Sequence, residues 1–354
     1  MRTVMVGMRR TLAIAVVGMV VLLGASASVY AQARPTTAPN TKGAGNGLKI
    51  YTVKTDIIVD KGNSRTVSVT VENITGSPVT VTAVTNDFVP SADESGEPRI
   101  ILDEKQRAPG NSFKSLISTL PTVTLAPSEK REVKITLSVP TNASSGGYYG
   151  AVRFSPGTGE NDKNVALTAS VGSIFLVRVP GDITEKLSVE GFTVLPIKSC
   201  DGGTATRPCT PVYGGAGSLF SNGPVAIETR FRNFGNIHVQ PFGKISIKNF
   251  SGKIIQEIEI NNSQPRGSVL PASIRKFTLP VSEKKLFGKY TAEASFGYGS
   301  NGELLLAKKT FYVIPFKLIA LVLGVLIFAI FILPRLIRSY NDSVIRRSKQ
   351  NRRK

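Results

Sequence analysis

The chain has 354 residues, a formal net charge of +20, two cysteines, one histidine and no tryptophan. So few soft ligands leave no basis for a zinc site, and the basic residues do not gather on one nucleic-acid-binding motif. The composition therefore predicts no metal, no cofactor and no nucleic-acid partner.

The first residues have the pattern of an export signal. Three arginines lie within the first ten residues, an uncharged apolar run covers 11–23, and Ala31 and Ala33 fit the small-x-small rule for cleavage. We predict a secretory signal peptide over 1–33, with a retained N-terminal anchor as the alternative. Residues 34–47, rich in Pro, Thr, Gly and Asn, predict a flexible leader.

From residue 48 to residue 314 the hydrophobic pattern has period two. In 66–71, Val67, Val69 and Val71 alternate with hydroxyl residues, and 132–139 alternates in the same way. No long segment in this region has a helical period, and Gly and Pro separate the short runs. The pattern predicts an all-β protein built from Ig-like β-sandwiches.

The second half of this region repeats the first. Residues 67–73 match 227–233, and the spacing that places Tyr149 after Gly147 recurs at Tyr290. The repeat predicts two tandem sandwiches, over 48–181 and over 182–314. By this alignment Tyr149 and Tyr290 share a core position.

Cys200 and Cys209 enclose a short segment containing Gly-Gly and Pro. Such a segment brings its ends together, and an exported chain meets oxidising conditions. We predict a disulfide between them, with two free thiols as the alternative.

Residues 315–334 form an apolar run with one charged residue, Lys317, near its start, and Pro334 marks its end. The run is long enough for one transmembrane helix. Residues 335–354 form a basic tail, which predicts a cytoplasmic C-terminus in a single-pass plasma-membrane protein and a tail that lies on the membrane surface. Its positive residues are Arg335, Arg338, Arg346, Arg347, Lys349, Arg352, Arg353 and Lys354.

The rest of the chain stays basic after both ends are removed. The tail carries a net charge of +7 and the first ten residues a net charge of +3. Of the total of +20, a net charge of about +10 therefore remains on residues 11–334. This charge favours an anionic wall polymer as a partner, and ordinary solubilising charge is the alternative.

The stretches 140–156, 171–192 and 230–253 resemble the family of WxL-interacting cell-surface proteins. The first two are similar to that family's peptidoglycan-binding domain and its bridge to the next domain, and the third is similar to its second, Ig-like module. The resemblance implies a membrane-anchored partner protein that helps to hold other surface proteins near peptidoglycan. Without tryptophan, stacking on sugars would rest on Tyr or Phe.

Catalytic residues are not apparent. His238 has no nucleophile motif beside it, so we interpret it as a turn or strand residue and the chain as a non-enzyme. Asp93, Glu94 and Glu97 lie in a polar loop without calcium-binding spacing, which we interpret as solvated.

Tyr148 and Tyr149 are the candidate binding residues. Neighbouring strand residues face opposite ways, so with Tyr149 in the core Tyr148 is the expected surface contact.

We therefore predict a non-enzymatic interaction scaffold on the cell surface that binds peptidoglycan or another surface protein. The alternative is a passive stalk, or a chaperone-like Ig module that accepts a strand from a partner. An unpaired, apolar edge strand would favour that alternative.

Overall fold

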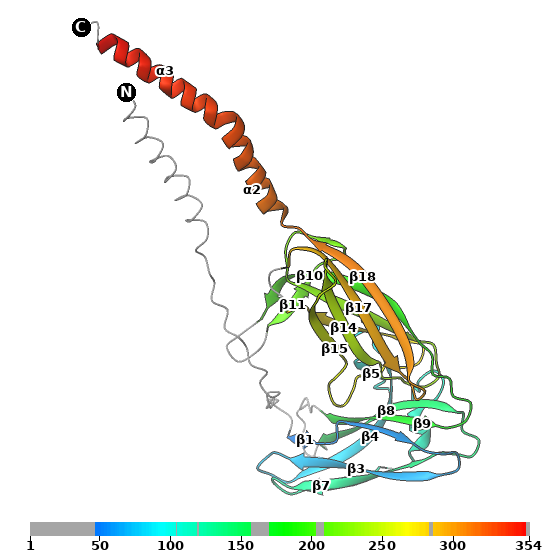
Figure 1. Ribbon diagram of the computed structural model, residues 1–354. Coiled ribbons are helices and arrows are strands. Elements are labelled where there is room, and N and C mark those ends of the chain that lie inside the picture. The colour runs from blue at the N-terminus through cyan, green and yellow to red at the C-terminus, as the bar shows by residue number, and fades with distance from the viewer. Residues whose placement is uncertain are drawn as a thin grey trace. The chain divides into compact units, whose positions relative to one another are not determined.

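The computed structural model describes residues 47–103, 105–118, 120–156, 170–202, 209–282 and 286–351 (Figure 1). The predicted signal peptide, nearly all of the predicted leader, and Arg352, Arg353 and Lys354 of the tail lie outside the described residues. The described strands form two groups. Strands β1 to β9 pair with one another, and so do β10 to β18.

The first group is a two-layered sandwich. One layer has the order β1-β3-β7, and the other has the order β2-β9-β8-β4-β5 with β6 also paired to β4. In Figure 1, β3 and β7 lie in one layer and β8 and β9 in the other. The bounds are β1 Leu48–Ile50, β2 Lys54–Ile58, β3 Ser64–Asn73, β4 Val79–Pro90, β5 Pro98–Ile100, β6 Thr122–Leu125, β7 Lys130–Ser138, β8 Gly146–Pro156 and β9 Val171–Val179; a 3-10 helix, η1, spans Phe113–Leu116.

The chain enters this sandwich by changing sheets. β1 pairs antiparallel with β3, and β2, a few residues later, pairs parallel with β9 in the opposite sheet. One N-terminal stretch thus contributes to both layers.

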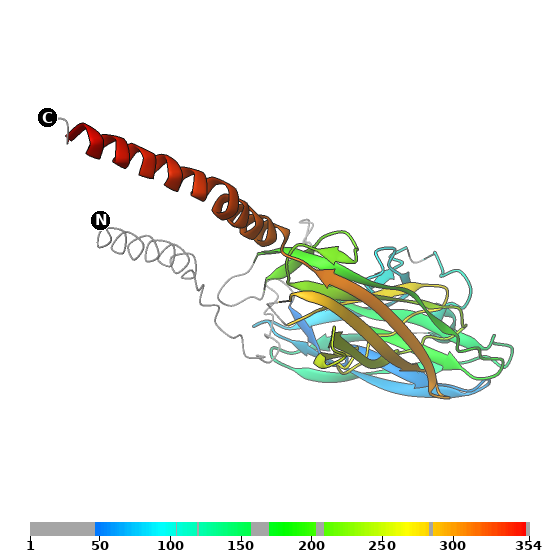
Figure 2. The same cartoon turned by 45° about the horizontal axis from the view of Figure 1, so that its top comes forward.

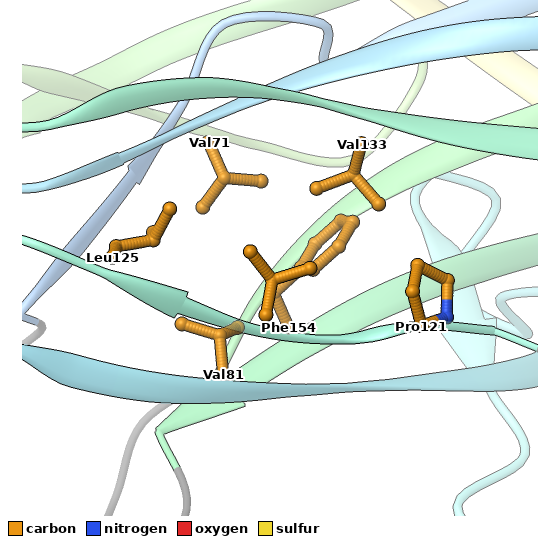
Figure 3. A pocket seen from close by; sticks show the side chains of 7 residues that line it. Val71, Val81, Pro121, Leu125, Val133 and Phe154 are labelled. Atoms are coloured by element: carbon orange, nitrogen blue, oxygen red, sulfur yellow. The ribbon is translucent and has the colours of Figure 1, made fainter.

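Alternating apolar residues fill the space between the two layers. Val133, Ile135 and Leu137 of β7 are buried, and the residues between them are exposed. Side chains from both layers meet around Phe154, as Figure 3 shows, and leave no cavity that a water molecule could enter (about 0 Å³). This space is packed core and not a ligand pocket.

The second group is also a two-layered sandwich. Its sheets have the orders β11-β10-β13-β16 and β12-β18-β17-β14-β15. A second buried cluster, centred on Phe231, Phe296 and Phe311, fills its interior. The bounds are β10 Leu187–Asp201, β11 Thr210–Tyr213, β12 Leu219–Phe220, β13 Val225–Asn233, β14 Phe242–Asn249, β15 Ile254–Ile260, β16 Ile274–Pro280, β17 Gly288–Tyr298 and β18 Glu303–Val313. The predicted all-β class and the Ig-like sandwiches are confirmed.

Cys200 and Cys209 are joined by a disulfide, with their Cα atoms 5.4 Å apart. Cys200 pairs with Pro211 across the β10–β11 ladder, so the bond closes the loop of a hairpin at the edge of its sheet.

The C-terminal helix begins right after β18, as both views show (Figure 2). It consists of α2 (Phe316–Ile327), a π-helical turn (Phe328–Ile332) and α3 (Leu333–Asn351), and its segment Phe316–Ser343 is long and apolar enough to cross a membrane. The expectation that Pro334 ends the helix is wrong. Pro334 is the second residue of α3, and the π turn precedes it. Pro334 thus lies inside a continuous helix, and the π-helical turn just before it changes the local hydrogen-bonding pattern at the point where a residue without an N–H must be accommodated.

Candidate functional site

Tyr148 and Tyr149 occupy opposite faces of β8, but in the reverse of the expected order. Tyr148 is 4% exposed, packs in the first core and donates its hydroxyl to the carbonyl of Ser144 at 3.0 Å. Tyr149 is half-buried and faces away from that core. The expected surface role of Tyr148 is wrong.

The error is a shift of one residue in the repeat. Gly146 and Gly288 both begin their strands with a positive φ (126° and 99°), and the core tyrosines Tyr148 and Tyr290 each follow two positions later. Gly146 is therefore the counterpart of Gly288. Because side chains alternate along a strand, aligning Gly147 with Gly288 turned every residue of β8 to the wrong face.

Tyr149 belongs to a polar cluster that connects the two groups of strands. His238, from the segment between β13 and β14, is 3% exposed. Its Nε2 atom lies 2.9 Å from Asp56 Oδ2 on β2, and its Nδ1 atom lies 3.4 Å from the Tyr149 hydroxyl. A neutral imidazole satisfies both contacts when Nε2–H donates to Asp56 and Nδ1 accepts from Tyr149.

Positive and polar groups surround the Asp56 carboxylate. Arg178 lies 3.5 Å from Asp56 Oδ1, and Gln240 donates to Oδ2 at 3.2 Å. Burial alone would raise the pKa of Asp56, but its hydrogen bond to His238 and the charges of Arg178 and Lys54 outweigh burial and lower it. Asp56 therefore stays ionised.

Lys54 makes a second connection. Its Nζ atom donates to the carbonyl of Arg266 at 2.8 Å and to the hydroxyl of Ser268 at 3.0 Å. Burial lowers the pKa of Lys54, the Asp56 charge raises it, and the Arg275 charge lowers it further.

The acidic loop of the first sandwich makes a third connection. Asp93 and Glu97 are exposed, as expected for a solvated loop, but Glu94 departs from that expectation. Both carboxylate oxygens of Glu94 accept from the Arg230 guanidinium, and the Glu94 carbonyl accepts the Lys276 N–H at 2.8 Å. Beside it, Gly96 packs against the Arg275 guanidinium. No described group of three or more His, Cys, Asp or Glu side chains could hold a metal ion, in this loop or elsewhere.

The cluster of Asp56, His238 and Tyr149 is suited to holding structure together. It brings a carboxylate, an imidazole and a hydroxyl into line, as many hydrolases do. However, the His238 side chain is only 2% exposed, and burial raises the pKa of the Tyr149 hydroxyl. A substrate has no access to the imidazole, and the hydroxyl is a poor nucleophile.

The second feature of interest is the edge of β18, which we call the open edge and define as residues 303–311. β12 pairs with β18 only at Tyr312 and Val313, and β10 of the opposite sheet approaches β18 without pairing with it. Before Tyr312, no described strand pairs with this side of β18.

The backbone of the open edge presents a regular row of free groups. Tyr312 donates its N–H to the carbonyl of Ser218, away from β17, at 2.7 Å. Outward-facing residues alternate along an antiparallel strand, so Leu304, Leu306 and Lys308 also direct their backbone groups away from β17. The leucine side chains are 62% and 73% exposed.

The edge strands β7, β15 and β16 are protected. β7 exposes Lys130, Glu132 and Lys134, and β15 exposes Glu257 and Glu259. The acidic loop caps β16. Charged side chains and covering loops usually keep an edge strand from pairing with another chain. The exposed leucines of β18 give no such protection, so this edge favours pairing with a strand of another chain.

In the tail, Arg335 donates to the carbonyl of Phe331 at 2.7 Å, and Arg338 lies in the same helix. Arg346, Arg347 and Lys349 belong to α3, but their side chains lie outside the described part.

No family model and no curated protein matches the chain. Several solved structures are similar to it, among them the class 5 fimbriae chaperone CfaA (10% identity, TM-score 0.35, covering 75% of this chain and 98% of that one) and the E. coli chaperone DraB (14% identity, TM-score 0.31, 75% and 98%). A Porphyromonas gingivalis W83 protein of unknown function is similar too (13% identity, TM-score 0.28, 76% and 100%). These scores are too low to carry an argument about function.

Little in the sequence pattern indicates the polar cluster. Asp56 and His238 are 182 residues apart, and neither lies in a motif. The open edge had a local signal in the run Leu304-Leu305-Leu306, where the strict alternation of a half-exposed strand breaks down.

Proposed function

We propose that this chain is a non-enzymatic, membrane-anchored surface protein whose second sandwich accepts an extended segment of a partner protein at the open edge. The observation that supports the proposal is the unpaired row of backbone groups beside the exposed Leu304 and Leu306 side chains. A partner strand laid there would gain main-chain hydrogen bonds and cover both leucines.

Anchoring is part of the proposal. Phe316–Ser343 meets the length and hydropathy of a membrane span. The excess of Lys and Arg after residue 334 favours a cytoplasmic C-terminus, with both sandwiches outside the plasma membrane.

Membership of the WxL-interacting family is also a proposal. A protein partner at the open edge is consistent with that membership. Direct stacking on peptidoglycan has less support, because Tyr148 is in the core and Tyr149 faces His238. An anionic wall polymer remains the alternative partner on the ground of charge, and its binding would be lost in salt.

The test uses a proline at an outward-facing position. The Leu306 N–H faces away from β17, so Leu306→Pro removes one donor of the open edge and breaks no hydrogen bond within the sheet. Leu306→Ala is the matched control, because it shortens the side chain and keeps the donor. A photo-crosslinking residue at Leu304 reports the partner in cells that display the full chain.

We expect a discrete protein adduct from Leu304 that Leu306→Pro reduces on the order of tenfold and Leu306→Ala reduces less. Equal thermal unfolding of the variants establishes that the fold is intact. An adduct of unchanged intensity in Leu306→Pro would refute strand addition. A crosslinker at Glu257, an exposed position on the acidic edge β15, is the control for chance encounters.

A further inference from the structure

The end of the second sandwich where β18 runs into the C-terminal helix carries a ring of exposed apolar side chains. We call it the rim and define it by five residues. They are Leu219, Phe250, Ile254, Phe287 and Tyr312, with exposed fractions of 55%, 80%, 46%, 67% and 40%.

Strand register places these residues at one end of the sheet. Tyr312 pairs with Leu219 on one side and with Lys289 on the other. Phe287 directly precedes Gly288, the partner of Val313. Two strands and one turn therefore bring apolar residues to the level of the last residues of β18.

The turn between β14 and β15 reaches the same level. Asn249, the last residue of β14, pairs with Tyr290, and Tyr290 pairs with Phe311. Phe250 comes next in the chain, so it lies beside the last residues of β18. Ile254 pairs with Lys248, one row further back.

The connection to the membrane span is very short. Only Ile314 and Pro315 separate Val313 from Phe316, and the Ile314 N–H donates to the carbonyl of Phe220 at 2.8 Å. The three residue steps from Val313 to Phe316 span at most about 10 Å when fully extended. Tyr312 therefore stays close to the bilayer surface once the helix spans it, and the other rim residues lie at the same end of the sheet.

We infer that the rim inserts into the interface of the leaflet in which the span begins, so that the second sandwich rests on the membrane. Aromatic and aliphatic side chains that end close to a span belong in the headgroup layer. Lys253 and Lys289 are exposed beside Phe250 and Tyr312, where they would meet lipid phosphates. The inference rests on the proposed anchoring.

A groove of about 430 Å³ borders the rim at Leu219 and Phe220, with Lys198 on its wall. At this level of the sheet it faces headgroups and not acyl chains, which suits its mixed polar and apolar lining.

The absence of tryptophan gives a direct test. Single substitutions Phe250→Trp and Phe287→Trp each introduce the only tryptophan of the full chain, reconstituted in vesicles with and without brominated lipids. Leu306→Trp, about 24 Å further along β18, is the control outside the membrane. Phe328→Trp is the control within the span.

The expected result is emission at shorter wavelength and loss of intensity with brominated lipid for the two rim variants and for Phe328→Trp, with no loss for Leu306→Trp. Lys253→Gln and Lys289→Gln should weaken the rim signal in anionic vesicles and leave it unchanged in neutral ones.

Quenching at Phe328→Trp without quenching at either rim variant would overturn the inference and leave the anchor intact. No quenching at Phe328→Trp would overturn the anchor and the inference together. Equal quenching at Leu306→Trp would show that the whole sandwich lies flat on the bilayer, which also overturns the specific role of the rim.

Discussion

Asn73 and Asn233 occupy equivalent places in the two sandwiches and have three kinds of hydrogen bond in common. Both are fully buried at the ends of their strands. The Asn73 amide donates to the carbonyl of Ser77 at 2.8 Å and to that of Leu125 at 3.2 Å, and its oxygen accepts the Thr75 N–H at 2.9 Å.

Asn233 repeats this arrangement residue by residue. Its amide donates to Ile237 at 2.8 Å and to Val269 at 2.9 Å, and its oxygen accepts the Gly235 N–H at 2.8 Å. In each sandwich one side chain thus closes the turn after a strand and ties it to a neighbouring segment.

Replacing Asn233 by alanine should destabilise the second sandwich. The change leaves the Ile237 carbonyl and the Gly235 N–H without partners, and the Val269 carbonyl keeps only the Val239 N–H, so we expect a loss of about 2–3 kcal/mol in the free energy of unfolding. Asn249→Ala, in a more exposed turn, should cost less than about 1 kcal/mol. Denaturant unfolding of the full chain measures both; equal effects would contradict the bridging role.

Tyr148→Ala should unfold the first sandwich and not merely remove a surface contact. Truncating a buried aromatic residue costs about 3–5 kcal/mol, whereas Tyr148→Phe loses only one hydrogen bond, about 1 kcal/mol. Thermal unfolding distinguishes the two variants. A stable Tyr148→Ala protein would show that the side chain is not part of the core.

Gly96→Ala should loosen the junction between the acidic loop and β16. A Cβ at Gly96 would come within 2.1 Å of the Arg275 side chain, at a φ of +80°. Gly110 has a similar φ of +90° and nothing within 4 Å, so Gly110→Ala pays the same backbone cost without the clash. Faster hydrogen exchange at the Lys276 N–H is expected for Gly96→Ala alone, and equal exchange in both variants would contradict the packing.

Acid should weaken the junction at Asp56. The folded protein holds the pKa of Asp56 below its ordinary value, so at low pH the unfolded chain binds more protons than the folded one. The contribution of Asp56 is complete above about pH 3.9, the ordinary pKa of Asp, and falls as the pH drops through the lower folded value.

Asp56→Asn removes that titration. Unfolding free energies measured from neutral pH down to acid should fall less steeply for Asp56→Asn than for the native chain. Asp201→Asn, at an exposed position, is the matched control and should leave the slope unchanged. Parallel curves for Asp56→Asn and the native chain would rule out the Asp56 contribution.

The disulfide should have a local effect. Replacing Cys200 and Cys209 together by serine opens a short loop, which costs about 2–3 kcal/mol at most. Hydrogen exchange should rise in the β10–β11 hairpin and stay unchanged in β17 and β18. A reductant applied to the native chain should reproduce the result; a general loss of protection would contradict a role confined to the hairpin.

Much of the architecture follows from local patterns in the sequence. Val133, Ile135 and Leu137 alternate with polar residues because one face of their strand is buried, and this alone predicts a half-buried strand. The apolar run from Phe316 likewise predicts a helix from length and composition, without knowledge of any neighbour. The spacing of the two cysteines made their pairing foreseeable too.

Only the tertiary structure decided which way Tyr148 and Tyr149 face, that Asp56 meets His238, and that residues 303–311 of β18 have no described strand paired along their outer side. A period of two is unchanged by a shift of one residue in the alignment, although such a shift exchanges core and surface. Contacts between residues 182 positions apart, and the absence of a neighbouring strand, depend on how distant segments pair. Local hydrophobic pattern carries no information about that pairing.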